Sequence, residues 1–210
     1  MSLRKAIFVV AGVGNGSGTG AASARAFAKA GYRVALIARN PEHLEKRLKA
    51  APFPVKAYTH ADVKSGFDAI KKHWPDGEIR VAVWNAAFTQ TNIIGAFAFA
   101  RQALLAFKDL EINDKGKRGS LIFTSATAAW RGNKTTAAFS SGKTGQRALA
   151  QSLNKEFGPQ NIHVSNVIID GVIRTDRTLS LSPESIANSY LYLTSQDRSA
   201  WTFVRLTPRA

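Results

Sequence analysis

A glycine-rich segment near the start of the chain combines residue types and spacing that bind phosphate. The segment AGVGNGSGTG runs from Ala11 to Gly20, and Gly14, Gly18 and Gly20 form a G-x-x-x-G-x-G pattern. Because glycine has no Cβ, such a turn lets backbone N–H groups and the N-terminus of a following helix approach a pyrophosphate. The segment therefore predicts a dinucleotide site, and the alternative is a glycine-rich turn that binds nothing.

The segments on either side of the glycines fit that prediction. An apolar run from Ile7 to Val10 precedes them and predicts a buried strand. An alanine-rich segment from Ala21 to Ala30 follows and predicts a helix, which ends at the glycine cap Gly31. A strand, a glycine turn and a helix in this order form the phosphate-binding part of a dinucleotide fold.

Predicted strands and helices alternate along the rest of the chain. The further strands are expected at 32–38, 54–58, 79–84, 119–125, 162–169 and 201–206. The further helices are expected at 41–49, through Ile70 to about Trp74, and at 92–110, 136–157 and 183–194. This alternation is typical of an α/β fold with a doubly wound parallel β-sheet flanked by helices. We find no linker or repeat, so the 210 residues predict one domain.

The charge and composition of the chain restrict its partners. There are 29 Lys and Arg residues against 14 Asp and Glu, which gives a net charge of +15. A charge of this size first suggests nucleic acid as a partner. The basic residues are scattered, however, without an aromatic-interleaved stripe. We therefore expect a phosphate-bearing cofactor or substrate and no nucleic acid, with a nucleic-acid binder built on a dinucleotide fold as a further hypothesis.

Other classes of partner are not expected. No apolar run is long enough to cross a bilayer, which predicts no membrane partner. The chain has no Cys, which is compatible with a cytoplasmic location. None of the four histidines falls at a predicted pocket, and no spacing predicts a metal site. We expect each histidine at the surface or in a helix.

Several different short motifs follow the glycine loop along the chain. Asp62-Val63 follows the third predicted strand, and Asn85-Ala86-Ala87 follows the fourth. Asn92-Ile93-Ile94-Gly95 opens a long helix, Lys143 lies in the next helix, and the loop from Asp170 to Thr175 follows the sixth strand. Together these motifs resemble the short-chain dehydrogenase/reductase family over essentially the whole chain.

The resemblance implies a single NAD(P)-binding Rossmann-type domain over residues 1–210, a small-molecule substrate and a homodimer or homotetramer. Its subunits would meet through the helices at 92–110 and 136–157. The resemblance also implies that Lys143 holds the ribose and that Asn92 belongs to the catalytic set. The implied cofactor-binding residues are Gly14, Gly16, Ser17, Gly18, Thr19, Gly20, Arg39, Asn40, Asp62, Val63, Asn85, Ala86, Ala87, Lys143, Gly171, Ile173 and Thr175.

The end of the second predicted strand indicates which dinucleotide binds. Members of the family that use NAD carry an acidic residue there, which binds the ribose 2′-OH. Here Ala38 is followed by Arg39 and Asn40. An arginine without the acidic residue favours a 2′-phosphate, so we expect NADP rather than NAD. The alternative is that Arg39 is a solvated residue at a strand end.

Two positions depart from the family's catalytic motif. The family has a tyrosine one helical turn before the lysine, as proton donor, and a serine that polarises the substrate oxygen. Phe139 stands one turn before Lys143, and Ala126, 13 residues before Phe139, aligns with the serine. A one-residue slip would place Ser125 there instead, and Thr127 is also near. No alignment brings Tyr32, Tyr58, Tyr190 or Tyr192 to the tyrosine position.

These departures leave two functional hypotheses. The first is an NADP-dependent oxidoreductase that acts on a small carbonyl or an activated alkene, with Lys143, Asn92 and Ser125 as its catalytic residues. Short segments around Ser125 to Thr127, Arg131 and Gly158 are similar to dienoyl-CoA reductases, which also lack this tyrosine and reduce C=C bonds. The second is an NADP-binding protein without turnover, because loss of a positioned proton donor costs about 10²–10⁴-fold in rate.

The connections from Asn85 to Asn92 and from Arg177 to Leu181 are shorter than in relatives, so either the site is open or the sequence lacks loop residues that cover it.

Overall fold

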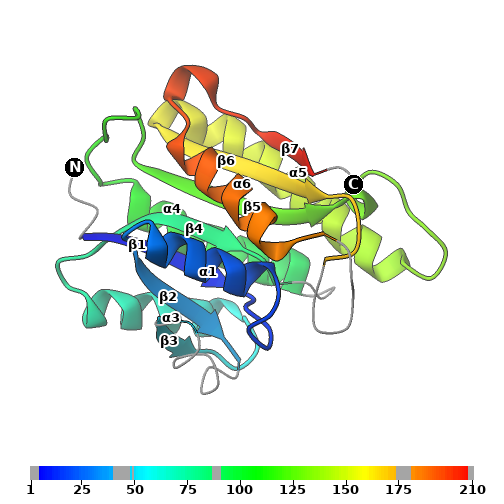
Figure 1. Ribbon diagram of the computed structural model, residues 1–210, viewed down its shortest axis with the longest axis horizontal. Helices are drawn as coiled ribbons and strands as arrows, with labels where there is room; N and C mark the ends of the chain where they lie inside the picture. The colour runs from blue at the N-terminus through cyan, green and yellow to red at the C-terminus, as the bar shows by residue number, and fades with distance from the viewer. Residues whose placement is uncertain (1–4, 40–47, 49, 87–90, 174–180, 208–210) are drawn as a thin grey trace.

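A seven-stranded parallel β-sheet forms the centre of the structure, with the strand order β3-β2-β1-β4-β5-β6-β7 (Figure 1). The computed structural model describes residues 5–39, 48, 50–86, 91–173 and 181–207. The strands are β1 Ala6–Ala11, β2 Arg33–Ala38, β3 Ala51–Pro54, β4 Glu78–Trp84, β5 Gly119–Ala126, β6 Ile162–Ile169 and β7 Val204–Thr207. The helices are α1 Thr19–Lys29, α3 His60–His73, α4 Ala96–Phe107, α5 Ala137–Phe157 and α6 Pro183–Ser195. A π-helical turn, η2 Thr91–Gly95, leads into α4, and short 3₁₀ turns lie at η3 Thr127–Ala129, η4 Gly158–Gln160 and η5 Arg198–Ala200.

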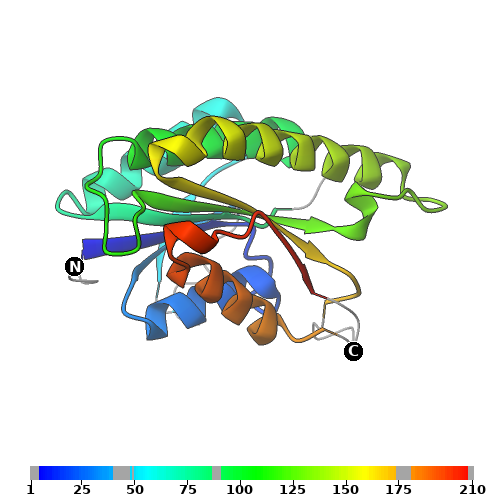
Figure 2. The same ribbon diagram turned by 90° about the horizontal axis from the view of Figure 1, so that it is seen from above.

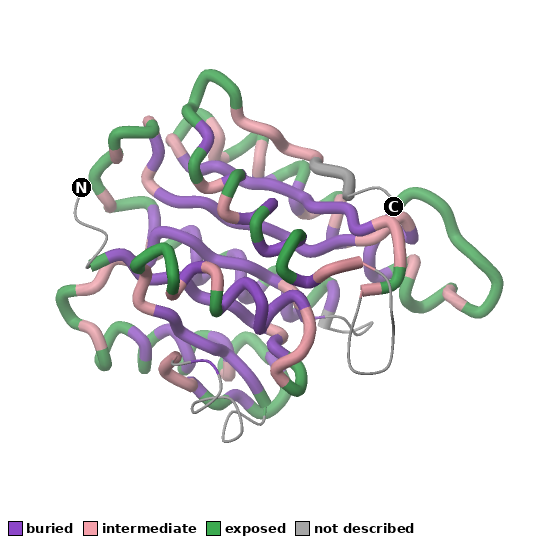
Figure 3. The backbone as a smooth tube through the Cα atoms, viewed as in Figure 1, coloured by how far each residue is buried: buried purple, intermediate pink, exposed green. Residues whose placement is uncertain are grey.

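Helices cover both faces of the sheet. Figure 2 shows α3, α4 and α5 on one face and α1 and α6 on the other. Strand β1 is apolar along its whole length because both of its faces are covered. On β1, Phe8 and Val10 join the core under α1 and α6, whereas Ile7 and Val9 join the core under α3 and α4. Buried positions accordingly follow the strands, and exposed ones follow the outer sides of the helices (Figure 3). The predicted doubly wound α/β domain is confirmed.

The strand order reverses beside β1, which pairs with β2 on one side and with β4 on the other. The connections that leave the carboxyl ends of β1 and β4 therefore run in opposite directions and leave a crevice between them. In open α/β sheets, ligands bind in this kind of crevice. The glycine loop follows β1 and Asn85 follows β4, so the fold brings these two predicted motifs together.

The third strand lies earlier than the sequence predicts. It was expected at residues 54–58 but is β3, Ala51–Pro54, at the edge of the sheet. The N–H groups of Ala57 and Thr59 turn toward the Asp62 carboxylate, and Tyr58 has a left-handed backbone with φ 56°. These features end the strand and begin α3. The helix expected at 41–49 falls outside the described residues except for Leu48.

Candidate functional site

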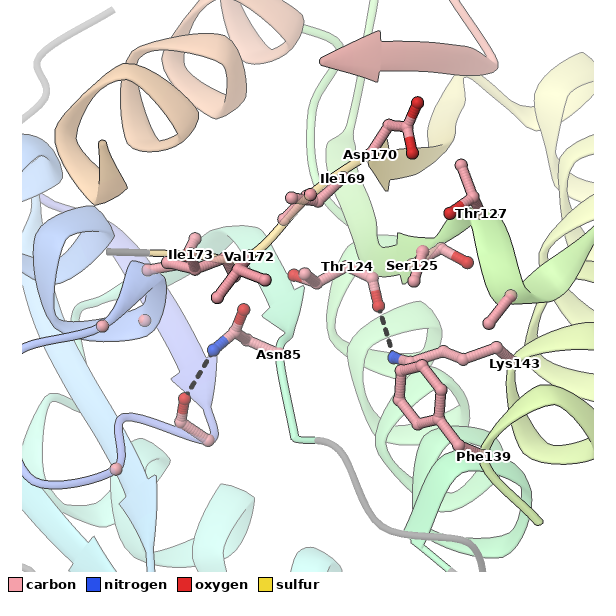
Figure 4. A pocket seen from close by; sticks show the side chains of 18 of the residues that line it. Asn85, Thr124, Ser125, Thr127, Phe139, Lys143, Ile169, Asp170, Val172 and Ile173 are labelled. Carbon is pink, nitrogen blue, oxygen red and sulfur yellow. Dashed lines mark hydrogen bonds between the residues drawn. The ribbon is translucent and has the colours of Figure 1, made fainter. Parts of the chain in front are cut away.

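A cavity of about 560 Å³ lies at the carboxyl ends of the strands. Its walls come from the glycine loop, the end of β4, the end of β5 with η3, the start of α5 and the loop after β6 (Figure 4). Of the predicted site residues, those that line it are Gly14, Ser17, Gly18, Thr19, Gly20, Asn85, Ser125, Lys143, Gly171 and Ile173. The remaining described ones, which are not among its lining residues, are Gly16, Arg39, Asp62, Val63, Ala86 and Asn92. Asn40, Ala87 and Thr175 lie outside the described residues.

The N-terminus of α1 faces this cavity without a cap of its own. Gly18 is the N-cap residue and makes no side-chain hydrogen bond, and the first turn contains no acidic residue. The Thr19 hydroxyl is buried and has no hydrogen-bond partner among the described residues. The first N–H groups of a helix attract an anion because the helix itself provides no acceptors for them. The residues present therefore fit the pyrophosphate of a dinucleotide.

The glycine loop packs so closely on the end of β4 that glycine is required at two positions. Gly12 has φ +89°, and a Cβ there would lie 2.5 Å from the backbone nitrogen of Ala86. A Cβ on Gly20 would overlap the carbonyl oxygen of Gly12. The Asn85 side chain holds the loop in place, because its Nδ2 donates to the Gly12 carbonyl oxygen at 2.7 Å (Figure 4).

The residues predicted for the adenosine end lie apart from the cavity. Arg39 is exposed directly after β2. Asp62 Oδ2 accepts hydrogen bonds from the backbone N–H of Ala57 at 2.9 Å and of Thr59 at 3.4 Å. The bond from Ala57 is the main reason why the pKa of Asp62 is lowered. Val63 is fully buried in the core.

Lys143 is buried in the wall of the cavity. Its Nζ donates to the backbone carbonyl oxygen of Thr124 on β5 at 2.8 Å and to Oε1 of Gln146 at 2.9 Å. Burial lowers the pKa of Lys143 to about 7. The sequence analysis missed Gln146, although its position three residues after Lys143 on one helix was a signal that the two side chains could meet.

Phe139 lies beside Lys143 at the mouth of the same cavity (Figure 4). The Lys143 Nζ is 5.9 Å from the centroid of its ring. At this position, where the resemblance in sequence places a tyrosine, the cavity is lined by a phenyl ring that has no proton to give. None of the four tyrosines, all of which the structure describes, lines the cavity. The Tyr190 hydroxyl lies 2.8 Å from the hydroxyl of Thr124, which lines the cavity, but complete burial raises the pKa of Tyr190.

The two candidates for the serine position point to opposite faces of the sheet. Side chains alternate along a strand, so Ala126 lies on the face of Thr124, whereas Ser125 lies on the face of Phe123, toward α4 and α5. The Ser125 hydroxyl is buried and has no partner among the described residues. Ser125, Ala126 and Thr127 all line the cavity.

Asn92 lies behind the cavity wall, in the π-helical turn η2. It is fully buried, and neither its Oδ1 nor its Nδ2 has a hydrogen-bond partner among the described residues. A Cβ on Gly142 would lie 3.0 Å from Asn92 Cβ, so the asparagine packs directly on α5 beside Lys143. Asn92 therefore packs against the residue that precedes Lys143, and its membership of the catalytic set stays a prediction.

Other types of site find no support in the described part of the chain. There, no group of three His, Asp or Glu side chains could hold a metal ion. The described helices include none that is long and apolar enough to cross a membrane. The expectation for the histidines is wrong for His163, which is buried on β6, where its Nε2 lies 2.8 Å from the Ser165 hydroxyl.

Comparisons with known proteins agree with this geometry. Residues 6–185 match the family model described as short chain dehydrogenase. A 3-oxoacyl-[acyl-carrier-protein] reductase from Bos taurus is 28% identical over 188 residues, which cover 78% of this chain and 74% of the relative.

Two solved structures show the same fold. A metagenomic short-chain oxidoreductase in complex with NADP has a TM-score of 0.82 at 22% identity, and the match covers 100% of both chains. A 3-ketoacyl-(acyl-carrier-protein) reductase from Brucella melitensis complexed with NADH has a TM-score of 0.82 at 21% identity, covering 98% of this chain and 97% of the other. The chain therefore belongs to the short chain dehydrogenase family of nicotinamide-dependent oxidoreductases, as the family match, the fold and the uncapped N-terminus of α1 together indicate.

Proposed function

We propose that this protein is an NADP-dependent oxidoreductase that moves a hydride to or from a small carbonyl or an activated alkene. The observation that carries the proposal is one continuous cavity that has the uncapped N-terminus of α1 at one end and Lys143 at the other. A bound nicotinamide dinucleotide would supply the hydride. The protein's own residues would bind the dinucleotide, hold the substrate against it and move the proton.

The proposed roles follow the walls of the cavity. The glycine loop and the first turn of α1, from Gly14 to Gly20, hold the pyrophosphate. Gly171 and Ile173 would contact the nicotinamide, and Lys143 would lie next to the ribose. Asn92 has two unpaired amide atoms that would hold a water molecule next to α5. Ser125, which also lines the cavity, remains a candidate for contact with the substrate oxygen.

The test is a single-turnover measurement of NADPH absorbance with aldehydes, ketones, enones and enoyl-thioesters. We expect one of these classes to consume NADPH. Replacement of Lys143 by Met should slow that reaction at least about 10²-fold, because the change removes a positioned polar group from the site. If no class is reduced although NADPH binds, the proposed activity is wrong.

The preference for NADP rests on Arg39. A guanidinium beside the adenosine ribose adds a charge-assisted contact to a 2′-phosphate and none to a hydroxyl. We expect Arg39→Ala to raise the Kd for NADPH about 10-fold and to leave the Kd for NADH within about twofold. Titration of nucleotide fluorescence measures both constants.

Arg101→Ala, on the outer side of α4, removes a matched exposed arginine and should change neither constant. An equal loss of NADPH and NADH affinity in Arg39→Ala would show that Arg39 does not contact the 2′-phosphate.

A second candidate function is supported by the cavity wall itself. Phe139 and Ala126 place a phenyl ring and a methyl group where the family motif has two hydroxyls. This arrangement favours a protein that binds NADP without turnover and whose occupancy reports the state of the cofactor. Both candidates predict NADPH binding, so consumption of NADPH separates them.

We further propose that the protein works as a cytoplasmic homodimer or homotetramer through the helices around α4 and α5. Large apolar side chains are exposed there, among them Ile94 and Phe97. Figure 2 shows α4 and α5 on the same face of the sheet. Exposed large apolar side chains that gather on one face mark protein–protein contacts more often than the surface of a monomer.

A further inference from the structure

The amino group of Lys143 is fixed by two acceptors that come from different elements. One is the Thr124 carbonyl oxygen of β5, and the other is Oε1 of Gln146 on α5. A charged lysine amine has three N–H donors, whereas a neutral amine has two and a lone pair. With two donors committed, one bonding position of Nζ remains in either state. Lys143 lines the cavity, so this position is the one that is available to a bound molecule.

We propose that Lys143 is itself the proton donor of this site, in the place of the missing tyrosine, and that Gln146 is the positioning residue that keeps its free bonding position toward the cavity. This inference rests on the proposed function, because it assigns the proton in the same hydride transfer. It concerns two residues that both lie on α5, one turn apart.

The surroundings of Gln146 show that its side chain serves Lys143. Gln146 is fully buried, and its Nε2 has no partner among the described residues. Among the described residues, the contact of Oε1 with Lys143 is the one hydrogen bond of this side chain. A buried amide that leaves a donor unpaired costs stability, so a contact with Lys143 is a reason for glutamine at this position. The other acceptor cannot move, because β5 is paired with β6 along its whole length. The amide of Gln146 therefore sets the orientation of the N–H bonds of Lys143.

The charge environment suits a proton donor near neutral pH. Burial lowers the pKa of Lys143 to about 7, and no charged side chain contributes to the shift. On α5, the guanidinium of Arg147 lies over the Trp130 ring, and at the end of β6 the Asp170 carboxylate lines the same cavity. From η2 and β5 the neighbours are the neutral Asn92, Thr124 and Ser125. A general acid works best when its pKa lies close to the working pH.

The proposed step balances for reduction of a carbonyl. The substrate carbon gains a hydride from the reduced nicotinamide, and the electron pair of the C=O π bond moves onto oxygen. One N–H bond of Lys143 breaks and its proton completes the hydroxyl group. The neutral amine keeps its two hydrogen bonds to Thr124 and Gln146, and its lone pair then takes a proton from a water molecule, which leaves as hydroxide into the solvent.

Variants at Gln146 test the proposal through the pH dependence of the single-turnover rate. In the unaltered protein, the rate should fall tenfold per pH unit above about pH 7, as the ammonium form disappears. In Gln146→Glu a carboxylate next to Nζ should move this descending limb of the pH–rate profile to higher pH, by about 1–3 pH units. In Gln146→Leu the limb should move to lower pH, because the charged amine loses an acceptor. Gln102→Leu removes another buried glutamine, on α4, and should leave the limb in place.

A second measurement needs no cofactor and no substrate. NMR of protein labelled with ε-¹³C lysine follows the titration of Lys143, whose signal is the one that Lys143→Met removes. The titration should shift upward in Gln146→Glu and downward in Gln146→Leu, and it should not change in Gln102→Leu. Thermal melts confirm that each variant is folded, and Gln146→Leu keeps the comparison available if the buried carboxylate does not fold.

The outcomes separate the proposal from the proposed function. If the NMR titration and the pH–rate limb shift together, Lys143 is the proton donor and Gln146 positions it. A shifted titration with an unchanged limb overturns the role as donor, while the proposed function stands. An unchanged titration in both Gln146 variants overturns the role of Gln146. If no substrate is reduced, the donor role fails together with the proposed function, and the NMR result alone decides whether Gln146 positions Lys143.

Discussion

Restoring the two hydroxyls of the family motif, by Phe139→Tyr together with Ala126→Ser, is expected to raise the rate of carbonyl reduction about 10²–10⁴-fold. Phe139 lies in the cavity wall one helical turn before Lys143, and its ring centroid is 5.9 Å from Nζ. A phenol at this position would stand beside an amine whose charge lowers the phenol's pKa. Ala126 ends β5 in the same wall, where a serine hydroxyl could bind the substrate oxygen.

Single-turnover loss of NADPH absorbance measures this effect, with NADPH affinity determined for each variant. Phe139→Tyr alone should provide most of the gain, because it supplies the proton donor. Phe157→Tyr, at the far end of α5, adds a hydroxyl outside the cavity and should leave the rate unchanged. If the double variant binds NADPH normally and shows no gain, the missing hydroxyls do not limit this site.

The second large effect is expected at the N-terminus of α1. Gly18→Asp should weaken NADPH binding at least about 10²-fold, because a carboxylate would stand where the pyrophosphate binds and like charges at close range cost several kcal/mol. The protein should remain as stable or become slightly more stable. Gly18 has an extended backbone with φ −87°, a Cβ there would meet nothing within 4 Å, and aspartate is a good N-cap residue.

Gly18→Asn is the matched comparison, since it adds a cap of the same size without the charge. Urea denaturation should give similar unfolding free energies for both variants, whereas their Kd values for NADPH should differ widely. Equal Kd values for the two variants would show that the phosphate charge is not bound at this turn. The glycine loop would then be a turn without a ligand.

Most of the fold could be predicted from the sequence, because the strands that carry it are apolar runs bounded by turns. β6 was predicted at its observed bounds, 162–169, and all of its residues are buried. The third strand was misplaced because its end depends on a side chain. Asp62 draws the N–H groups of Ala57 and Thr59 out of strand geometry, and this competition is not visible as hydrophobic periodicity.

The site was predictable where one segment carries the function and less so where several elements meet. The glycine loop is continuous in sequence, and it lines the cavity as expected. The partner of Lys143 on β5 is the backbone of Thr124, which no residue type could signal. Adjacent residues of a strand always face opposite sides, but only the structure shows which face Ser125 and Ala126 each occupy. An alignment that can slip by one residue does not decide this.

The hydrogen bond between Asn85 and the Gly12 carbonyl has a consequence for how the protein folds. It joins groups that are 73 residues apart in the chain, so the dinucleotide crevice is complete only after β1 and β4 have paired. Contacts of such long sequence separation form late and slowly in folding. A nucleotide that binds this crevice stabilises the native state by a free energy that grows with the logarithm of its concentration relative to Kd. It should therefore act mainly by slowing unfolding, and NADP should extend the lifetime of the folded protein without changing how fast it forms.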